Sequence, residues 1–270
     1  MADLTLKLKA APAVRIDLSG LIPALKARQS AAELDHLVVA DGLHPLRLGD
    51  VFAITGSAGG SIAIEGGSGR IDGIGAGLTT GTLTVDGDAG AGAGRGMSGG
   101  RLDICGSAGS YLASGMKAGI IHVSGSVGDF AGGVGAGKRF GMTGGTVVVD
   151  GDIGARAGDK MRRGLILVRG KTGEAAGSRM IGGTIVAEGG FGPGPGQLMR
   201  RGSLIGPKAE QMLSTFADCG VHDLVILKVM SRAWARGLGP LAPRALPQAV
   251  RRFAGDLATI GKGELLLTAS

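Results

Sequence analysis

Histidine and cysteine are the residues that most often ligate metals or act as bases and nucleophiles, and this chain has six of them. They are His36, His44, His122, His222, Cys105 and Cys219. Their spacing matches no zinc-binding motif, and two cysteines far apart in sequence indicate free thiols rather than a disulfide framework. The sequence therefore predicts no metal site on this chain.

Glycine-rich stretches could instead bind phosphate. Candidates are "GDAGAGAGRG" at 87–96, "GGFGPGPG" at 189–196 and "GTVVVDGDIGARAGDKMRRG" at 145–164. A phosphate loop lies between a strand and the N-terminus of a helix, and no helical pattern follows the first two stretches. The third recurs nineteen residues later with its glycines and methionine at the same offsets, which favours a scaffold over a binding loop.

Paired carboxylates would be needed for glycoside hydrolysis, usually beside aromatic surfaces. The outward aspartates Asp86, Asp150 and Asp152 adjoin glycines at turns, where short polar side chains are common anyway. Tyr111 is the only tyrosine in the chain. These features disfavour a carbohydrate-cleaving enzyme.

Clustered basic residues indicate a binding surface more strongly than the glycine loops or the aspartates do. Eleven Lys or Arg stand against five Asp or Glu between 138 and 201, in a chain of net charge +7. The candidate contacts for an acidic partner are Lys138, Arg139, Arg162, Arg163, Arg200 and Arg201. Such a column attracts an acidic polymer, an acidic protein or nucleic acid, although a solvated charged face is an equally good interpretation. Nucleic acid is the least favoured, because few aromatic residues accompany the basic groups.

A repeat must position these residues. Its first glycines are Gly60, Gly81, Gly100, Gly119, Gly145, Gly164, Gly183 and Gly202, with spacings of 21, 19, 19, 26, 19, 19 and 19 residues. The period is nineteen residues, with seven extra residues before Gly145. After each of the first seven of these, a second glycine follows six residues later and a third nine residues later. Between the first two, apolar residues alternate as in Leu83 and Val85, which is typical of a strand with one buried face.

Six methionines occur three residues before the next first glycine, and we expect them to stack in one column: Met97, Met116, Met142, Met161, Met180 and Met199. Short units of this kind bury their apolar face only when neighbours stack on them. The sequence predicts a mainly β fold, a β-helix of about seven coils over 50–202. A cap at 1–49 and a partly helical cap at 203–270 would cover the open ends.

Within the C-terminal cap, "PKAEQMLSTFADCG" from Pro207 predicts a helix that stops at Gly220, and a second short helix is expected near Pro247. Trp234 is expected to be a packing anchor. No window reaches the length of a membrane span and no cleavable leader is visible, so a cytoplasmic protein without membrane contact is expected.

The glycine phases over 60–202 and the closing "RRFAGDLATIGKGELLL" at 251–267 resemble the C subunits of formylmethanofuran dehydrogenase and of the bacterial formyltransferase/hydrolase complex. "HPLRLGDVFAITG" at 44–56 is also similar to the family's entry into the first coil. The repeat alone looks like the C-terminal glycine-rich domain of the glutamate synthase large subunit as well. The C-terminal segment, with Phe253, Gly255, Asp256 and "GKGE" at 261–264, favours the two C-subunit families over glutamate synthase.

The resemblance implies a right-handed β-helix in a hetero-oligomer. Catalysis would belong to partners, namely an amidohydrolase-like subunit with metals, a formyltransferase subunit that uses tetrahydromethanopterin, and a further subunit. Nineteen arginines against ten lysines favour the bacterial complex over a hyperthermophilic dehydrogenase with molybdenum or tungsten. That complex moves formyl from formyl-tetrahydromethanopterin to a methanofuran-type carrier and releases formate in one-carbon oxidation.

This non-catalytic structural role is the first hypothesis, and the basic column would then guide the carrier's glutamate-rich tail. The alternatives are the C subunit of the dehydrogenase, a stand-alone polyanion-binding module, and a glutamate synthase-like module. The insertion between Gly128 and Gly145, with Phe130 and Phe140, is either a partner contact or a longer surface loop.

Overall fold

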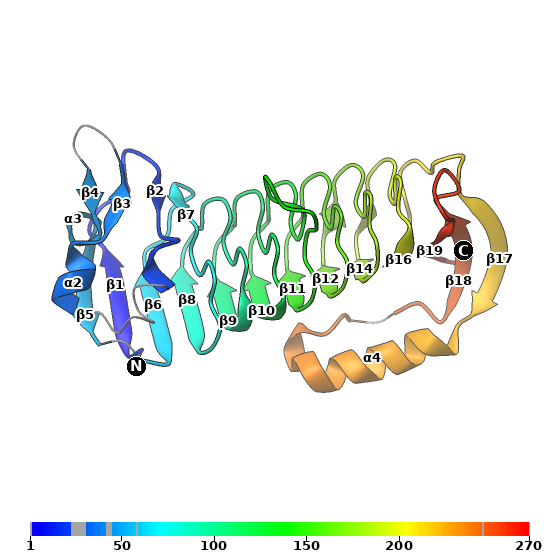
Figure 1. Ribbon diagram of the computed structural model, residues 1–270. Coiled ribbons are helices and arrows are strands. Elements are labelled where there is room, and N and C mark those ends of the chain that lie inside the picture. Colours follow the sequence, from blue (N-terminus) through cyan, green and yellow to red (C-terminus); the bar gives the residue numbers. More distant parts are fainter. Residues whose placement is uncertain (1, 23–30, 42–44, 58, 245, 270) are drawn as a thin grey trace.

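The computed structural model of the protein describes residues 2–22, 31–41, 45–57, 59–244 and 246–269; His44, from the predicted entry segment, lies outside these ranges. The fold is mainly β. One mixed sheet of thirteen strands runs the length of the molecule, and a helix lies alongside its C-terminal half (Figure 1).

Parallel strands in sequence order form the centre of the sheet. They are β6 (Ser61–Glu65), β8 (Thr82–Asp86), β9 (Ser98–Ile104), β10 (Ala118–Val123), β11 (Thr146–Val149), β12 (Leu165–Val168), β14 (Thr184–Ala187) and β16 (Arg201–Gly206). Leu102 pairs with Leu83 on one side and with Ile121 on the other. Each strand therefore adds one coil, and the nineteen-residue period predicted from the glycines is confirmed.

A second wall closes each coil. Its parallel bridges join Ala89, Ala108, Val127, Ile153 and Thr172 in one line. Two short pairs extend the line: β13 (Lys171–Thr172) with β15 (Gly190–Phe191), and β2 (Ile16–Asp17) with β7 (Ile71–Asp72). Side chains fill the interior between the walls, where Leu83, Leu102 and Ile121 are fully buried.

Two glycine columns have separate physical causes. From Gly81 onward the first glycine of a coil has a positive φ, as at Gly164 (110°), where a Cβ would meet the carbonyl oxygen of Gly145 at 2.8 Å. From Gly106 to Gly170, the second glycine makes room for a polar side chain of the preceding coil. A Cβ on Gly170 would lie 2.1 Å from Asp152 Oδ1, which accepts the Lys171 N–H. The first column therefore requires glycine for its positive φ and close backbone approach, and the second requires it to leave room for a side chain.

The methionine column is confirmed. All six predicted methionines are fully buried. From Met97 to Met180, each methionine lies against the first glycine two coils later. A Cβ on Gly164, for example, would lie 2.7 Å from the methyl carbon Cε of Met142. Glycine and methionine thus fill one corner of the tube together.

The N-terminal end of the sheet is closed by β1 (Leu4–Leu8), which pairs parallel with β6 and antiparallel with β5 (Phe52–Gly56). A hairpin and two short helices complete this end: β3 (Val38–Ala40) with β4 (Leu46–Arg47), α2 (Ala31–Asp35) and α3 (Leu48–Val51). Leu4 and Leu6 extend the buried column of the coils.

The C-terminal end is closed by strands, and the two predicted helices are wrong. β19 (Lys262–Thr268) pairs parallel with β16, and β18 (Ala249–Gly255) and β17 (Ala217–Asp223) follow antiparallel. Residues 207–216 continue the coil, because the open last coil needs partners. The Lys208 carbonyl accepts the Phe191 N–H, and the Phe191 carbonyl accepts the Glu210 N–H. These bonds outweigh local helix propensity. The segment after Pro247 likewise forms the strand β18 instead of a helix, because its backbone pairs with β19 and β17.

The helix of this region is α4 (Val225–Leu238), followed by the 3-10 turn η1 (Gly239–Leu241). It packs on the outer face of the sheet over Val148, Leu167, Val186 and Ile205, and Leu227 is its buried residue. Trp234 contacts the same cluster, so its predicted role as a packing anchor is confirmed.

Candidate functional site

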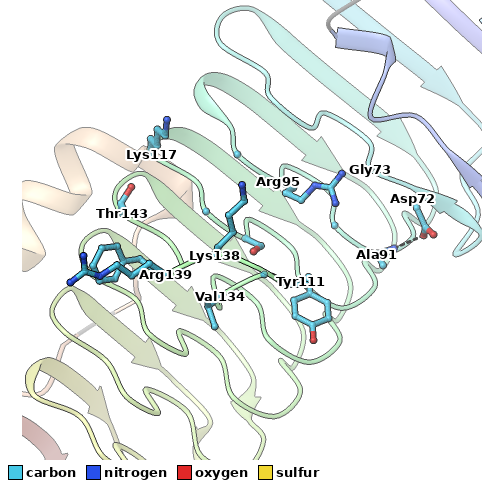
Figure 2. A pocket seen from close by; sticks show the side chains of 18 of the residues that line it. Asp72, Gly73, Ala91, Arg95, Tyr111, Lys117, Val134, Lys138, Arg139 and Thr143 are labelled. Carbon is cyan, nitrogen blue, oxygen red and sulfur yellow. Dashed lines mark hydrogen bonds between the residues drawn. The ribbon is translucent and has the colours of Figure 1, made fainter.

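A cavity of about 1190 Å³ lies where the seven extra residues leave the regular coil. Glycines of three consecutive coils line it, among them Gly73, Gly92, Gly96 and Gly115, together with residues 134–136 and 138–141 of the insertion. Figure 2 shows Val134, Lys138 and Arg139 of the insertion together with Gly73, Arg95 and Lys117 of the preceding coils. The insertion thus converts a corner of the scaffold into a concave surface, which is the usual form of a binding site.

The inserted loop leaves the coil at Gly132 and returns at Gly141. The coil closes beneath it, because the Gly132 carbonyl accepts the Met142 N–H and the Lys160 carbonyl accepts the Gly141 N–H. The loop has its own turn, in which the Lys138 N–H donates to the Gly135 carbonyl, and at Gly135 it lies close to the Ser114 hydroxyl. It therefore projects over the cavity without interrupting the stack.

Four cationic side chains line the cavity: Arg95, Lys117, Lys138 and Arg139. All four residues are exposed, and among the described residues none of them forms a salt bridge. Two carboxylates, Asp17 and Asp72, also line the cavity, on the side of the N-terminal cap. The middle and the loop side therefore carry uncompensated positive charge.

Both carboxylates are already hydrogen-bonded. Asp72 accepts from the Arg15 guanidinium at 2.8 and 2.5 Å and from the Ala91 N–H at 2.7 Å. Asp17 accepts from the backbone and hydroxyl of Ser19 at 2.8 and 2.9 Å. These bonds hold the N-terminal wall of the cavity in place and leave the four cations available to meet an anion.

Phe140, at the end of the loop, lies near two cations. The guanidinium carbons of Arg139 and Arg162 are 5.0 and 5.3 Å from the centre of its ring. Cation–π contacts of this length favour the observed arrangement by about 0.5–1 kcal/mol each at an exposed site. Phe140 thereby links the cavity to the coil that carries Arg162 and Arg163.

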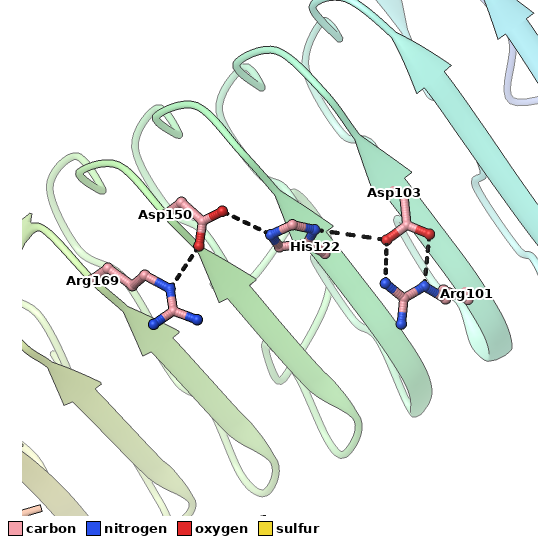
Figure 3. A network of polar contacts seen from close by, with 5 residues as sticks. All are labelled: Arg101, Asp103, His122, Asp150 and Arg169. Atoms are coloured by element: carbon pink, nitrogen blue, oxygen red, sulfur yellow. Dashed lines mark hydrogen bonds and ion pairs between the residues drawn. The ribbon is translucent and has the colours of Figure 1, made fainter. Parts of the chain in front are cut away.

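A second polar group lies on the outer face of the sheet, across β9 to β12 (Figure 3). His122 Nε2 is 2.9 Å from Asp150 Oδ2, and its Nδ1 is 3.8 Å from Asp103 Oδ1. Arg101 pairs with Asp103 at 2.6 Å and Arg169 with Asp150 at 2.7 Å. Burial would raise the pKa of Asp150, but the hydrogen bonds from His122 and Arg169 outweigh it and lower that pKa. Each member has a partner, as expected for a structural network.

Known proteins share this architecture along its whole length. The chain is 50% identical over 265 residues to the C subunit of the formyltransferase/hydrolase complex Fhc from Methylorubrum extorquens (strain AM1), covering 98% of this chain and 99% of that protein. The chain belongs to the family of formyltransferase/hydrolase complex C subunits. No general family model matches the sequence.

A solved structure of the Fhc family has the same fold. It is the crystal structure of the formyltransferase/hydrolase complex (FhcABCD) from Methylorubrum extorquens in complex with methylofuran. One of its chains superimposes with a TM-score of 0.92 and 41% identity, covering 98% of this chain and all of that one. The resemblance inferred from the glycine phases and the tail is therefore confirmed, and the bacterial branch is the right one.

The structure divides the six predicted basic residues of this Fhc-family chain into two groups. Lys138 and Arg139 line the cavity, whereas Arg162 does not line it but contacts the ring of Phe140, which does. Arg163, Arg200 and Arg201 are exposed and do not line it. Lys117, Arg162 and Arg200 keep the same phase at intervals of two coils, so their backbones follow the edge of the stack roughly 10 Å apart.

Sequence reasoning missed Arg95 and Tyr111 as members of the site. Each lies in an ordinary coil, and only the position of the insertion further along the stack brings them under the loop. Tyr111 could have been found by comparing coils near the insertion, because it stands where the two preceding coils have Gly73 and Gly92. All three residues have a positive φ, which is 63° at Tyr111.

Neither a metal site nor a membrane span occurs in the part of the chain that the structure describes. Within those ranges, no three His, Cys, Asp or Glu side chains are grouped so that they could hold a metal ion. No helix in the same ranges is long and apolar enough to cross a membrane.

Proposed function

We propose that this chain is the structural, non-catalytic subunit of a formyltransferase/hydrolase complex. In this proposal the partner subunits transfer formyl from formyl-tetrahydromethanopterin to a methanofuran-type carrier and release formate. The observation that carries the proposal is the match to an Fhc C subunit over 98% of this chain and 99% of that protein. A match along both whole chains is expected of proteins that hold the same place in an assembly.

The stacked coils suit a subunit that holds other proteins at fixed separation. Hydrogen bonds join neighbouring coils in both walls, and the interior column continues from β1 to β19. We infer a right-handed β-helix over 50–202, with 1–49 and 203–270 as its two caps. In a rod of this kind each coil is supported by both neighbours, so partner subunits along its sides would keep their spacing.

The role is tested by purifying the tagged chain from its own cells and by assaying it alone. We expect the amidohydrolase-like and formyltransferase subunits to copurify with it, and the isolated chain to release no formate from a formylated carrier. Rapid formate release by the isolated chain would contradict the non-catalytic role. Copurification with an amidotransferase instead would contradict membership of the complex.

We also propose that the basic column, extended by Lys117, guides the glutamate-rich tail of the carrier. Its cations support this, because Lys117, Lys138 and Arg139 surround the cavity and Arg162, Arg163, Arg200 and Arg201 continue along the stack. None of these seven forms a salt bridge among the described residues. A flexible anionic tail is attracted by such a line of charges without any single strong contact.

Carriers of different tail length test the guiding role. Reversing Arg162 and Arg163 to glutamate should raise the KM of the assembled complex for a long-tailed carrier by roughly 3- to 10-fold, with a smaller rise for a short-tailed one. Reversing Arg232 and Arg236, two exposed arginines on α4, makes the same change of charge elsewhere. Equal losses with both carriers, or equal effects of the two reversals, would refute the guiding role.

A further inference from the structure

An aromatic stack at the corner of the coils ends inside the cavity. The rings of Tyr111 and Phe130 are 5.0 Å apart at their centres and only 5° from parallel. Arg156, one coil further, places its guanidinium carbon 6.0 Å from the centre of the Phe130 ring. All three residues have positive φ and occupy the same position in successive coils.

The next position of this column has no side chain. It is Gly92, one coil before Tyr111, and a Cβ added there would meet nothing within 4 Å. Tyr111 keeps 38% of its surface exposed and lines the cavity together with Gly92 and Gly73. One face of the Tyr111 ring is therefore covered by Phe130. The other face is open to the cavity, beside Gly92, which has no side chain to cover it.

The surrounding charges define what else a ligand must carry. Arg95, Lys117 and Lys138 line the same cavity without carboxylate partners among the described residues (Figure 2). A neutral ring would leave these cations unpaired, and an anion without a ring would leave the Tyr111 face bare. A ring that carries carboxylates satisfies both features, since planar rings stack and carboxylates accept charge-assisted bonds.

We propose that this cavity binds a planar aromatic ring joined to a carboxylate chain. The ring stacks on Tyr111 above Gly92, and the carboxylates meet Arg95, Lys117 and Lys138. The cavity of about 1190 Å³ has room for a ring and several linked residues. This site would add a specific contact to the proposed guiding of the carrier tail. It rests on that proposal only for the identification of the carrier as the natural ligand.

The single tyrosine makes the site directly observable. A full-length chain in which tyrosine is replaced by 3-fluorotyrosine gives one ¹⁹F resonance, from position 111, because the sequence has only one tyrosine. Two probes differ only in the ring: benzoyl-tetraglutamate and acetyl-tetraglutamate. We expect the benzoyl probe to shift the resonance by its ring current and to bind about 5- to 10-fold more tightly, since an aromatic pair adds roughly 1 kcal/mol.

Two substitutions separate the ring from the charges. Tyr111→Ala should remove the preference for the benzoyl probe in direct binding measurements and leave acetyl-tetraglutamate binding unchanged, whereas Tyr111→Phe should keep the preference. Gly92→Tyr should extend the stack from within the chain and exclude the benzoyl probe, because the same position already holds Tyr111 and Phe130 in later coils. Circular dichroism of each variant verifies that it is folded.

Charge reversal completes the test. Lys138→Glu should weaken both probes by at least about 3-fold, while Lys208→Glu, an exposed lysine outside the cavity, should leave both unchanged. Equal binding of the two probes with no ring-current shift would overturn the aromatic site and leave the tail proposal standing. Failure of both probes to bind at millimolar concentration would overturn both, while the structural role is decided separately by copurification.

Discussion

The two halves of the outer face of the sheet are built on the same coil and have opposite chemistry. In the N-terminal half the middle outward position carries Thr84, Asp103 and His122, and it is partly exposed. In the C-terminal half the same position carries Val148, Leu167 and Val186, and it is buried under α4. The boundary is bridged by Arg169, which bonds to Asp150 and to the Pro240 carbonyl of η1.

This difference shows that one repeat can support two kinds of surface without a change of register. β8 alternates between buried and more exposed residues, whereas all four residues of β12 are buried. The interior column continues through both halves, so the coil supplies the stack and the outward residues decide what covers it. A strand that is apolar on both faces is typical of a sheet covered on both sides.

The largest effect should come from the covered half. Leu167→Ala removes a fully buried side chain from the α4 interface and should lower the free energy of unfolding by about 2–5 kcal/mol. Thr84→Ala, at the same position in the uncovered half, should cost less than about 0.5 kcal/mol. Urea denaturation followed by circular dichroism measures both changes. Similar costs for the two would mean that α4 does not form a second core.

A buried polar residue inside the tube should give a smaller change of opposite sign. Thr172 is 1% exposed, and its Oγ1 has no hydrogen-bond partner among the described residues. Thr172→Val keeps the shape and removes this unsatisfied group, so it should raise the free energy of unfolding by about 1 kcal/mol. Thermal denaturation should show a higher Tm than the parent chain. A lower Tm would mean that the hydroxyl has a partner in solution.

The smallest effect should come from the polar half and should depend on pH. The lowered pKa of Asp150 means that its ionised form stabilises the fold above the ordinary value of 3.8, and that this contribution is lost as the pH falls through the lower folded-state value. Asp150→Asn should therefore cost up to about 1 kcal/mol at neutral pH, because the site is partly solvated. The cost should shrink below pH 3.8. Urea denaturation at pH 7 and pH 3 measures it.

Asp86→Asn is the control for that experiment. Asp86 has the same place in its coil and forms no ion pair among the described residues. Its substitution should change the unfolding curve little at either pH. A cost for Asp150→Asn that stays constant across this pH range would show that the charge of Asp150 contributes nothing to the network.

The sequence predicted the features that recur in every coil and missed those that depend on one place in the fold. Glycine and methionine columns are visible because each coil meets the same steric demand, as at Gly164 and Met142. The second core was missed although its signal is present, since Val147, Val148 and Val149 are continuously apolar. The cavity could not be predicted, because it depends on how one inserted loop projects over the preceding coils.

The C-terminal helix was predicted one segment too early for a related reason. Local signals at Pro207 and Gly220 favoured a helix, but the open end of the last coil supplies hydrogen-bond partners that no local pattern reveals. Once residues 207–216 are used to continue the coil, the helix forms at 225–238, where Leu227, Met230 and Trp234 can face the apolar outer sheet.

The central claim is that this chain organises catalysis carried out by other subunits. It is tested most directly by formate release in a complex reassembled from purified subunits with and without this chain, with a formylated pterin as the formyl source and an unformylated methanofuran-type carrier as the acceptor. We predict that omission abolishes the transfer of formyl from the pterin to the carrier and hence its release as formate, while the hydrolytic subunit still cleaves a short formylated carrier added directly. Undiminished coupled formate release without this chain would contradict the account.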